Sequence, residues 1–107
     1  MKFPIVVCPW LRVNGMALFP FILLKQRDDN YYSSLVFHER IHLRQQLELL
    51  IVPFYLLYFV NYLFNLFYYK DHHRAYMNIV FEKEAYANDQ YKNYLKERRF
   101  WAFLSYL

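Results

Sequence analysis

Apolar and polar positions divide the chain into an irregular N-terminal part and a series of helical patterns. In residues 1–32, short apolar stretches alternate with turn-forming residues, which predicts strands and loops. Asn14-Gly15 is a turn signal, and the apolar run Met16–Leu24 is interrupted by Pro20. Because proline lacks the amide donor that a central strand needs, this run predicts an edge strand or a short hairpin. The polar segment Lys25–Asn30 predicts a loop.

A helical pattern runs from residue 33 to about residue 50. Ser33 and Ser34 are both suited to cap its N-terminus, because a serine hydroxyl accepts a hydrogen bond from a free amide of the first turn. The segment is rich in apolar side chains, as a buried helix requires: Leu35, Val36, Phe37, Ile41, Leu43, Leu47 and Leu50.

The stretch Leu49–Tyr69 carries no formally charged residue. By length alone it would suffice for a transmembrane helix, which needs about 20 apolar residues. Pro53, two asparagines and five tyrosines weaken that interpretation. We predict a helix over residues 54–69 and leave open whether it packs in the core or lies at a membrane interface.

The C-terminal part contains a further helical pattern over residues 74–93 and an apolar tail over residues 94–107. The whole chain of 107 residues has the size of one domain, with 58% hydrophobic and 23% aromatic residues but only one glycine. Few glycines favour helices over a turn-rich β-sandwich. We therefore predict a mainly α (α+β) fold: a minimal helical domain with a short N-terminal β-ribbon or edge strand.

Charge and cysteine content exclude several classes of partner and site. The net charge of +4 is modest and its basic residues are dispersed, which argues against a nucleic-acid partner. A basic chain rich in aromatics suits contact with an anionic membrane surface. Cys8 is the only cysteine, so neither an internal disulfide nor a cysteine zinc site is expected. Phe3–Trp10 is too short and too proline-rich for a convincing signal peptide, and we expect a cytoplasmic protein or one peripheral to the inner face of a membrane.

His38-Glu39-Arg40-Ile41-His42 forms an H-E-x-x-H motif within the helix of residues 33–50. Histidines four residues apart lie on one helical face, so His38 and His42 can bind one metal ion. Glu39 lies beside that face, where it can act as general base on a metal-bound water. The alternative is a helix with two solvated histidines, which the apolar flanks disfavour. The motif predicts a zinc-dependent hydrolase.

A catalytic zinc ion usually takes three protein ligands, and no third histidine follows at the expected spacing. The candidates are Glu82 and Glu84, which on a helix face nearly opposite directions and cannot both bind the ion. Glu82 is favoured, because Tyr86 and Asp89 continue its stripe and can orient a histidine ring. Glu84 remains the alternative third ligand.

With these residues the chain resembles the gluzincins, in which H-E-x-x-H is followed by a helix that bears a glutamate ligand. It is most similar to the branch that includes prenyl-protein endopeptidases, antirepressor metallopeptidases and minigluzincins. The segment Glu82–Tyr86 fits the second motif of that branch, with Tyr86 where the family has Asp and Asp89 one turn further on. The resemblance covers residues 16–90. It implies a zincin-like domain, a Zn²⁺ cofactor and a peptide or protein substrate, with Ala17–Leu24 as the strand that holds an extended peptide.

A shared metal ion also limits how residues 49–69 can lie. If that segment crossed a bilayer once, His42 and Glu82 would lie on opposite sides of about 30 Å of hydrocarbon. Two crossings would need about 40 apolar residues. We therefore expect a bend at Pro53, after which the chain folds back and brings Glu82 to the histidines.

The leading hypothesis is a zinc metallopeptidase with His38, His42 and Glu82 as ligands and Glu39 as general base. The residues considered as donors to the oxyanion are Tyr76, Tyr86, His72, His73 and Arg74. One alternative is a membrane-associated interaction protein with a structural metal site or none. Another is a latent or degenerate peptidase, in which the tail Phe100–Leu107 folds over the cleft.

Overall fold

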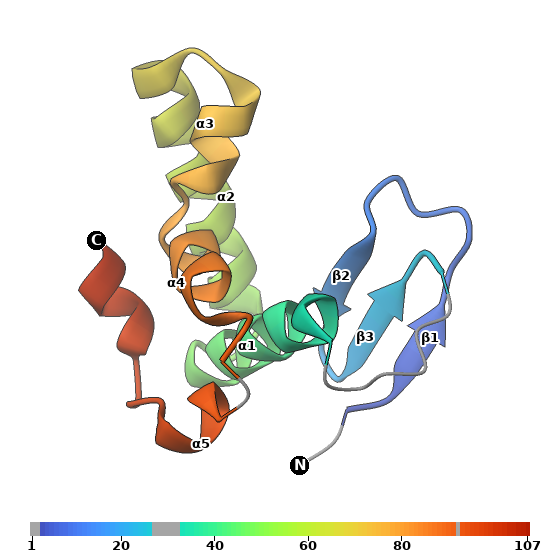
Figure 1. Cartoon of the computed structure of the whole chain (residues 1–107). Coiled ribbons are helices and arrows are strands. Elements are labelled where there is room, and N and C mark those ends of the chain that lie inside the picture. The colour runs from blue at the N-terminus through green and yellow to red at the C-terminus, as the bar shows by residue number, and fades with distance from the viewer. Residues whose placement is uncertain (1–2, 27–32, 92) are drawn as a thin grey trace.

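The structure is a computed structural model and describes residues 3–26, 33–91 and 93–107. A three-stranded sheet formed by the N-terminal part precedes the helices (Figure 1). The predicted α+β, mainly helical fold is therefore confirmed. Of the loop expected over Lys25–Asn30, residues 27–30 lie outside the described part of the chain.

The sheet consists of β1 (Ile5–Val7), β2 (Gly15–Leu18) and β3 (Phe21–Leu24), in the order β1-β3-β2. β3 pairs parallel with β1 and antiparallel with β2. The turn between β2 and β3 contains Pro20, so the predicted short hairpin is confirmed and β2 is an edge strand.

Helix α1 (Ser34–Glu48) packs on this sheet. Ser33 caps it, because its Oγ accepts a hydrogen bond from the Val36 amide at 3.3 Å. Side chains from both layers form one buried cluster: Ala17, Ile22, Leu24, Val36 and Leu43. This packing fixes α1, and with it the H-E-x-x-H motif, against β2.

Helix α2 (Val52–Tyr69) leaves α1 at an angle of 113°. The break comes at Leu50 and Ile51, which have positive φ values of 61° and 68°, and Pro53 lies in the first turn of α2. The expected bend therefore exists, two to three residues before Pro53. Among the described residues, no single helix is both long and apolar enough to cross a membrane, although α1 and α2 as a bent pair meet that length and composition.

The helix expected over residues 74–93 is wrong as one continuous element. The structure has α3 (His72–Met77) and α4 (Val80–Asn88), separated at Asn78 and Ile79. Asn61 of α2 explains the break, since its Oδ1 accepts a hydrogen bond from the Val80 amide at 2.8 Å and caps α4 from outside. Ile79 is fully buried between the two helices.

The C-terminal segment forms α5 (Tyr94–Glu97) and the 3₁₀ helix η1 (Ala102–Tyr106). Phe103 of η1 joins Phe54, Ile79 and Phe81 in a second buried cluster. The structure contradicts the alternative in which this tail folds over a cleft at the motif: η1 packs on α4, and no described residue after Asp89 lines the cleft that contains His38, Glu39 and His42. Figure 1 shows η1 lying beside α4.

Candidate metal centre

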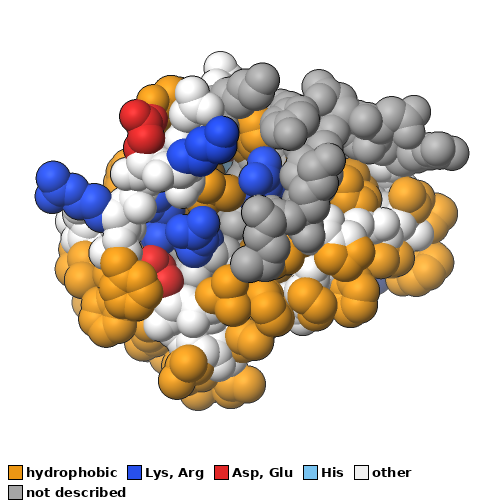
Figure 2. Space-filling model, turned by 90° about the horizontal axis from the view of Figure 1, so that it is seen from below, with side chains coloured by type: hydrophobic (Ala, Val, Ile, Leu, Met, Phe, Trp, Pro, Cys, Tyr) orange, Lys and Arg blue, Asp and Glu red, His pale blue; other side chains and the backbone are white. Residues whose placement is uncertain are grey.

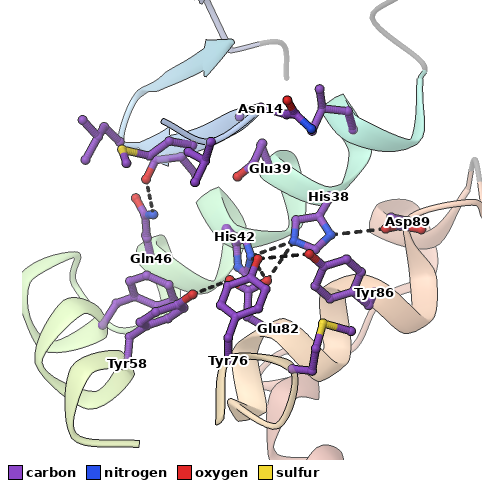
Figure 3. A pocket seen from close by; sticks show the side chains of 18 of the residues that line it. Asn14, His38, Glu39, His42, Gln46, Tyr58, Tyr76, Glu82, Tyr86 and Asp89 are labelled. Carbon is purple, nitrogen blue, oxygen red and sulfur yellow. Dashed lines mark hydrogen bonds and ion pairs between the residues drawn. The ribbon is translucent and has the colours of Figure 1, made fainter. Parts of the chain in front are cut away.

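Helix α1 presents His38 and His42 on one face, and both imidazoles are buried. Their Nε2 atoms lie 3.2 Å apart. Helix α4 brings Glu82 to the same point, with Oε1 at 2.9 Å from the Nε2 of each histidine. Figure 3 shows the three side chains converging from α1 and α4. They are the one group of metal-ligand type found among the described residues.

The spacing of these three atoms suits a small divalent cation. Ligands at about 2.05 Å from a tetrahedral zinc ion are about 3.3 Å apart. The distances of 2.9 to 3.2 Å between the three atoms are up to a few tenths of an ångström shorter than this ligand–ligand distance. Small side-chain movements would therefore admit an ion, and two imidazoles with one carboxylate are a donor set that zinc accepts.

Hydrogen bonds to the other ring nitrogens fix the direction of both imidazoles. His38 Nδ1 lies 3.2 Å from Oδ2 of Asp89, and His42 Nδ1 lies 2.8 Å from Oε1 of Gln45. Because each Nδ1 is hydrogen-bonded to an oxygen, Nε2 is the ring nitrogen that faces the common point. Asp89 thus occupies the place that the sequence assigned to it.

Glu82 is held as a carboxylate by its surroundings. Tyr58 of α2 donates a hydrogen bond to its Oε2 at 2.5 Å, which leaves Oε1 for the histidines. Burial alone would raise the pKa of Glu82, but the charge of His42 and hydrogen bonds from His38, His42 and Tyr58 hold it well below its usual range. Burial alone would lower the pKa of His42, but the neighbouring Glu82 carboxylate raises it from 6.5 to about 9.

Glu39 differs from the other buried carboxylates of the site. It is 6% exposed and lines the same cleft, yet its carboxylate has no hydrogen-bond partner among the described residues. Burial raises the pKa of Glu39 above its ordinary value, while the two histidines oppose that shift. It points toward β2 (Figure 3), where a Cβ added to Gly15 would lie 3.2 Å from its Oε2. A buried carboxylate without a partner is suited to accept a proton from a molecule in the cleft.

Glu84, the alternative third ligand, has a different set of partners. It is fully buried and pairs with Arg98, while Tyr94 donates to it at 2.5 Å. Gln45 Nε2 also donates to Glu84 Oε1 at 2.9 Å, and the oxygen of the same amide contacts His42. Glu84 therefore reaches the metal centre only through Gln45.

The cleft in front of these residues has a volume of about 900 Å³ and is bounded by β2, α1, α2, α3 and α4. Tyr76 and Tyr86 face it with their hydroxyl oxygens 3.1 Å apart, and the Tyr86 ring lies 4.3 Å from the ring of His38. Burial is the largest cause that raises the pKa of both tyrosines, so both stay neutral donors. His72 and His73 also line the cleft, whereas Arg74 does not.

Three contributors to the site were not expected from the sequence: Tyr58, Gln45 and Arg98. Tyr58 belongs to an apolar helix in which polar side chains recur on one face. That periodicity could have indicated that this face packs against the site. Gln45 lies one turn after His42, so its contact with the ring follows from helical spacing. Arg98 has no such signal, because its contacts with Glu48 and Glu84 join residues far apart in sequence.

Comparison of the chain with protein-family models, with curated proteins and with solved structures finds no match. The evidence for the site is therefore its geometry. His38, His42 and Glu82 form a buried group, contributed by the motif helix and a downstream helix, and this group is consistent with an H-E-x-x-H-type centre.

Proposed function

We propose that the chain is a zinc-dependent metallopeptidase in which His38, His42 and Glu82 hold the ion and Glu39 is the general base. The single observation that carries this proposal is the partnerless, buried Glu39 in the same cleft as three converging metal ligands. A structural metal site has no need of a free carboxylate at that place. A hydrolase does, because water must lose a proton as it attacks.

Bound zinc would supply Lewis-acid polarisation and lower the pKa of water toward neutrality. Residues of the chain transfer the proton, stabilise the oxyanion and orient the ligands. Glu39 accepts the proton from the attacking water and returns it to the nitrogen of the leaving amine. Tyr76 and Tyr86, as neutral phenols at the opposite wall, donate hydrogen bonds to the carbonyl oxygen as negative charge develops on it. Asp89 and Gln45 keep the histidine rings in the orientation that holds the ion.

The edge strand β2 supports a peptide as substrate. The Ala17 carbonyl accepts from Gln46 Nε2 and from the Tyr55 hydroxyl, both at 2.9 Å, so this carbonyl faces away from β3. By strand alternation, the Gly15 amide and carbonyl face the same edge, where Gln46 and Tyr55 occupy the Ala17 carbonyl. An extended peptide that pairs with Gly15 at this edge lies along the cleft, beside Glu39.

The test is substitution of Glu39 by Gln in the full chain, with Glu97→Gln, an exposed glutamate of α5, as the matched control. Hydrolysis of fluorescein-labelled casein and of a quenched fluorogenic peptide library is measured together with zinc content. We expect Glu39→Gln to keep its zinc and to lose about 10²- to 10⁴-fold in rate. Glu97→Gln should match the wild type, and an unchanged rate in Glu39→Gln would contradict the proposal.

A binding protein without a metal site predicts a different result. In that case the purified chain holds no zinc, and His38→Ala leaves both its metal content and its melting temperature unchanged. A peptidase instead requires that His38→Ala loses zinc, because it removes one of three ligands.

A further inference from the structure

The side chains of α2 are arranged in the reverse of the usual order for a helix on a protein surface. Three of its polar side chains, Tyr58, Asn61 and Asn65, face the protein and are hydrogen-bonded there. Tyr58 donates to Glu82, Asn61 accepts from the Val80 amide, and Asn65 donates to the Ala75 carbonyl. Only Phe54 and Asn65 of the helix are buried. A surface helix of a water-soluble protein directs such groups to solvent and its apolar groups to the core.

The opposite face of α2 consists of hydrocarbon side chains over the whole length of the helix. The exposed residues of that face are Val52 (65%), Leu56 (63%), Phe59 (59%), Val60 (60%), Leu63 (37%), Phe64 (72%) and Phe67 (84%). At 100° per residue they fall within one half of the helix circumference. No charged residue occurs between Val52 and Tyr69. Contiguous apolar surface of this extent marks a site that another apolar phase or partner covers.

Figure 1 shows that α2 and α3 project beyond the rest of the fold. The exposed fractions of the outward side chains show that no other described element covers this face. Hydrophobic side chains also gather along the lower margin of the molecule in Figure 2, separate from a group of Lys and Arg side chains above them.

We propose that α2 binds a lipid bilayer, with its outward face inserted into the hydrocarbon boundary of a membrane that contains anionic lipids. Eighteen residues of helix measure about 27 Å, so the face offers a long hydrocarbon strip. A second protein surface would be expected to meet a rim of hydrogen-bonding groups along the strip, and the outward side chains from Val52 to Phe67 offer none.

The end of the strip carries the groups that suit lipid headgroups. Tyr68 is 73% exposed, and exposed Lys70 and Arg74 follow it. Tyrosine favours the level of the headgroups, and basic side chains attract anionic lipids. The net charge of +4 acts in the same direction. This inference does not depend on the metal centre.

The test is flotation of the full chain with vesicles of phosphatidylcholine and phosphatidylglycerol on a sucrose gradient. Phe64→Ser and Phe67→Ser remove two outward side chains of α2. Trp10→Ser is the matched control, because Trp10 is 78% exposed but lies between β1 and β2. We expect each phenylalanine variant to lower the partition coefficient about tenfold and Trp10→Ser to leave it within about twofold. Circular dichroism and melting temperature check that each variant folds.

Three outcomes would overturn the proposal. The wild-type chain does not float with vesicles, the phenylalanine variants float as well as the wild type, or the wild type is a dimer that Phe67→Ser dissociates while vesicles bind neither. The last result would assign the face to a second copy. Equal binding to vesicles of phosphatidylcholine alone would contradict the part of the proposal that requires anionic lipids.

Discussion

At the scale of single residues, His42 and Glu82 form a buried pair whose charges affect each other's pKa. Their side chains are 7% and 5% exposed, and their contact distance is 2.9 Å. Water cannot screen the interaction at that depth, so the carboxylate favours a protonated imidazole. Bound zinc requires the opposite, a neutral imidazole. Protonation and metal therefore compete for the same nitrogen.

Zinc affinity should consequently rise with pH. Since the pKa of His42 is about 9 without metal, the imidazole must release a proton when zinc binds near neutral pH. We expect the apparent association constant to increase about tenfold per pH unit between about pH 6.5 and 8.5. Competition with a chromophoric chelator measures it. An association constant independent of pH over that range would contradict the assignment of His42 Nε2 as ligand.

The stability of the metal-free chain should change with pH in the other direction. The folded pKa of His42, about 9, lies above the ordinary value of 6.5. Its contribution to the free energy of unfolding is therefore fully present below pH 6.5 and is lost as the pH rises through 9. Melting temperatures in excess chelator should fall across that window, whereas those in excess zinc should not.

At the scale of elements, the corner between α1 and α2 has the most strained backbone of the described chain. Ile51 has φ 68° and ψ −72°, and the Val52 amide donates to the Leu50 carbonyl at 2.8 Å across it. This is a γ-turn with positive φ, which is rare and strained for a β-branched residue. The strain is tolerated because the corner directs α2, and with it Tyr58, back toward Glu82.

Glycine at that corner should relieve the strain. We expect Ile51→Gly to have a free energy of unfolding about 1 kcal/mol higher than that of Ile51→Ala, because both lose the isoleucine side chain but only glycine adopts positive φ without a steric penalty. Ile51→Ala is the control: it keeps the strain and loses apolar burial, so it should lower stability. Urea unfolding measures both. A lower stability for the glycine variant than for the alanine variant would show that the corner is not strained.

At the scale of the whole molecule, Arg98 ties the C-terminal segment to the two helices that form the metal centre. It pairs with Glu48 at the end of α1 and with Glu84 on α4. Glu48 also accepts from the Trp101 amide at 2.8 Å. Burial alone would raise the pKa of Glu84, but hydrogen bonds from Arg98, Tyr94 and Gln45 lower it. Glu84, which accepts a hydrogen bond from Gln45, therefore depends on Arg98 from the C-terminal segment for its charge partner.

Removing that cation should destabilise the fold and loosen the centre. We expect Arg98→Met to cost about 3–5 kcal/mol in unfolding free energy, since it leaves two buried carboxylates without their partner. Zinc affinity should fall about 10- to 100-fold through Gln45 and His42. Arg99→Met, at an exposed neighbouring position, should change stability by less than about 0.5 kcal/mol. Wild-type stability in Arg98→Met would show that the ion pairs are unimportant.

The sequence by itself determined the local features of this protein. Helical spacing placed His38 and His42 on one face, Pro20 marked the hairpin of β2 and β3, and the stripe from Glu82 to Asp89 pointed to the side chain that contacts His38. These predictions succeed because each depends on residues within one or two turns, or on the short-range rules of proline and helix caps.

Only the tertiary structure decided how distant residues combine. The predicted helix of residues 74–93 is two helices, because Asn61 caps the second one. The polar side of α2 faces the protein, where Tyr58 binds Glu82. Glu84 pairs with Arg98. The physical reason is common to all three. A buried polar group must find a partner, and which partner lies within reach depends on the packing of elements that are far apart in sequence. The chain specifies the two histidines locally, but the fold supplies Glu82, Tyr58 and the cleft around them.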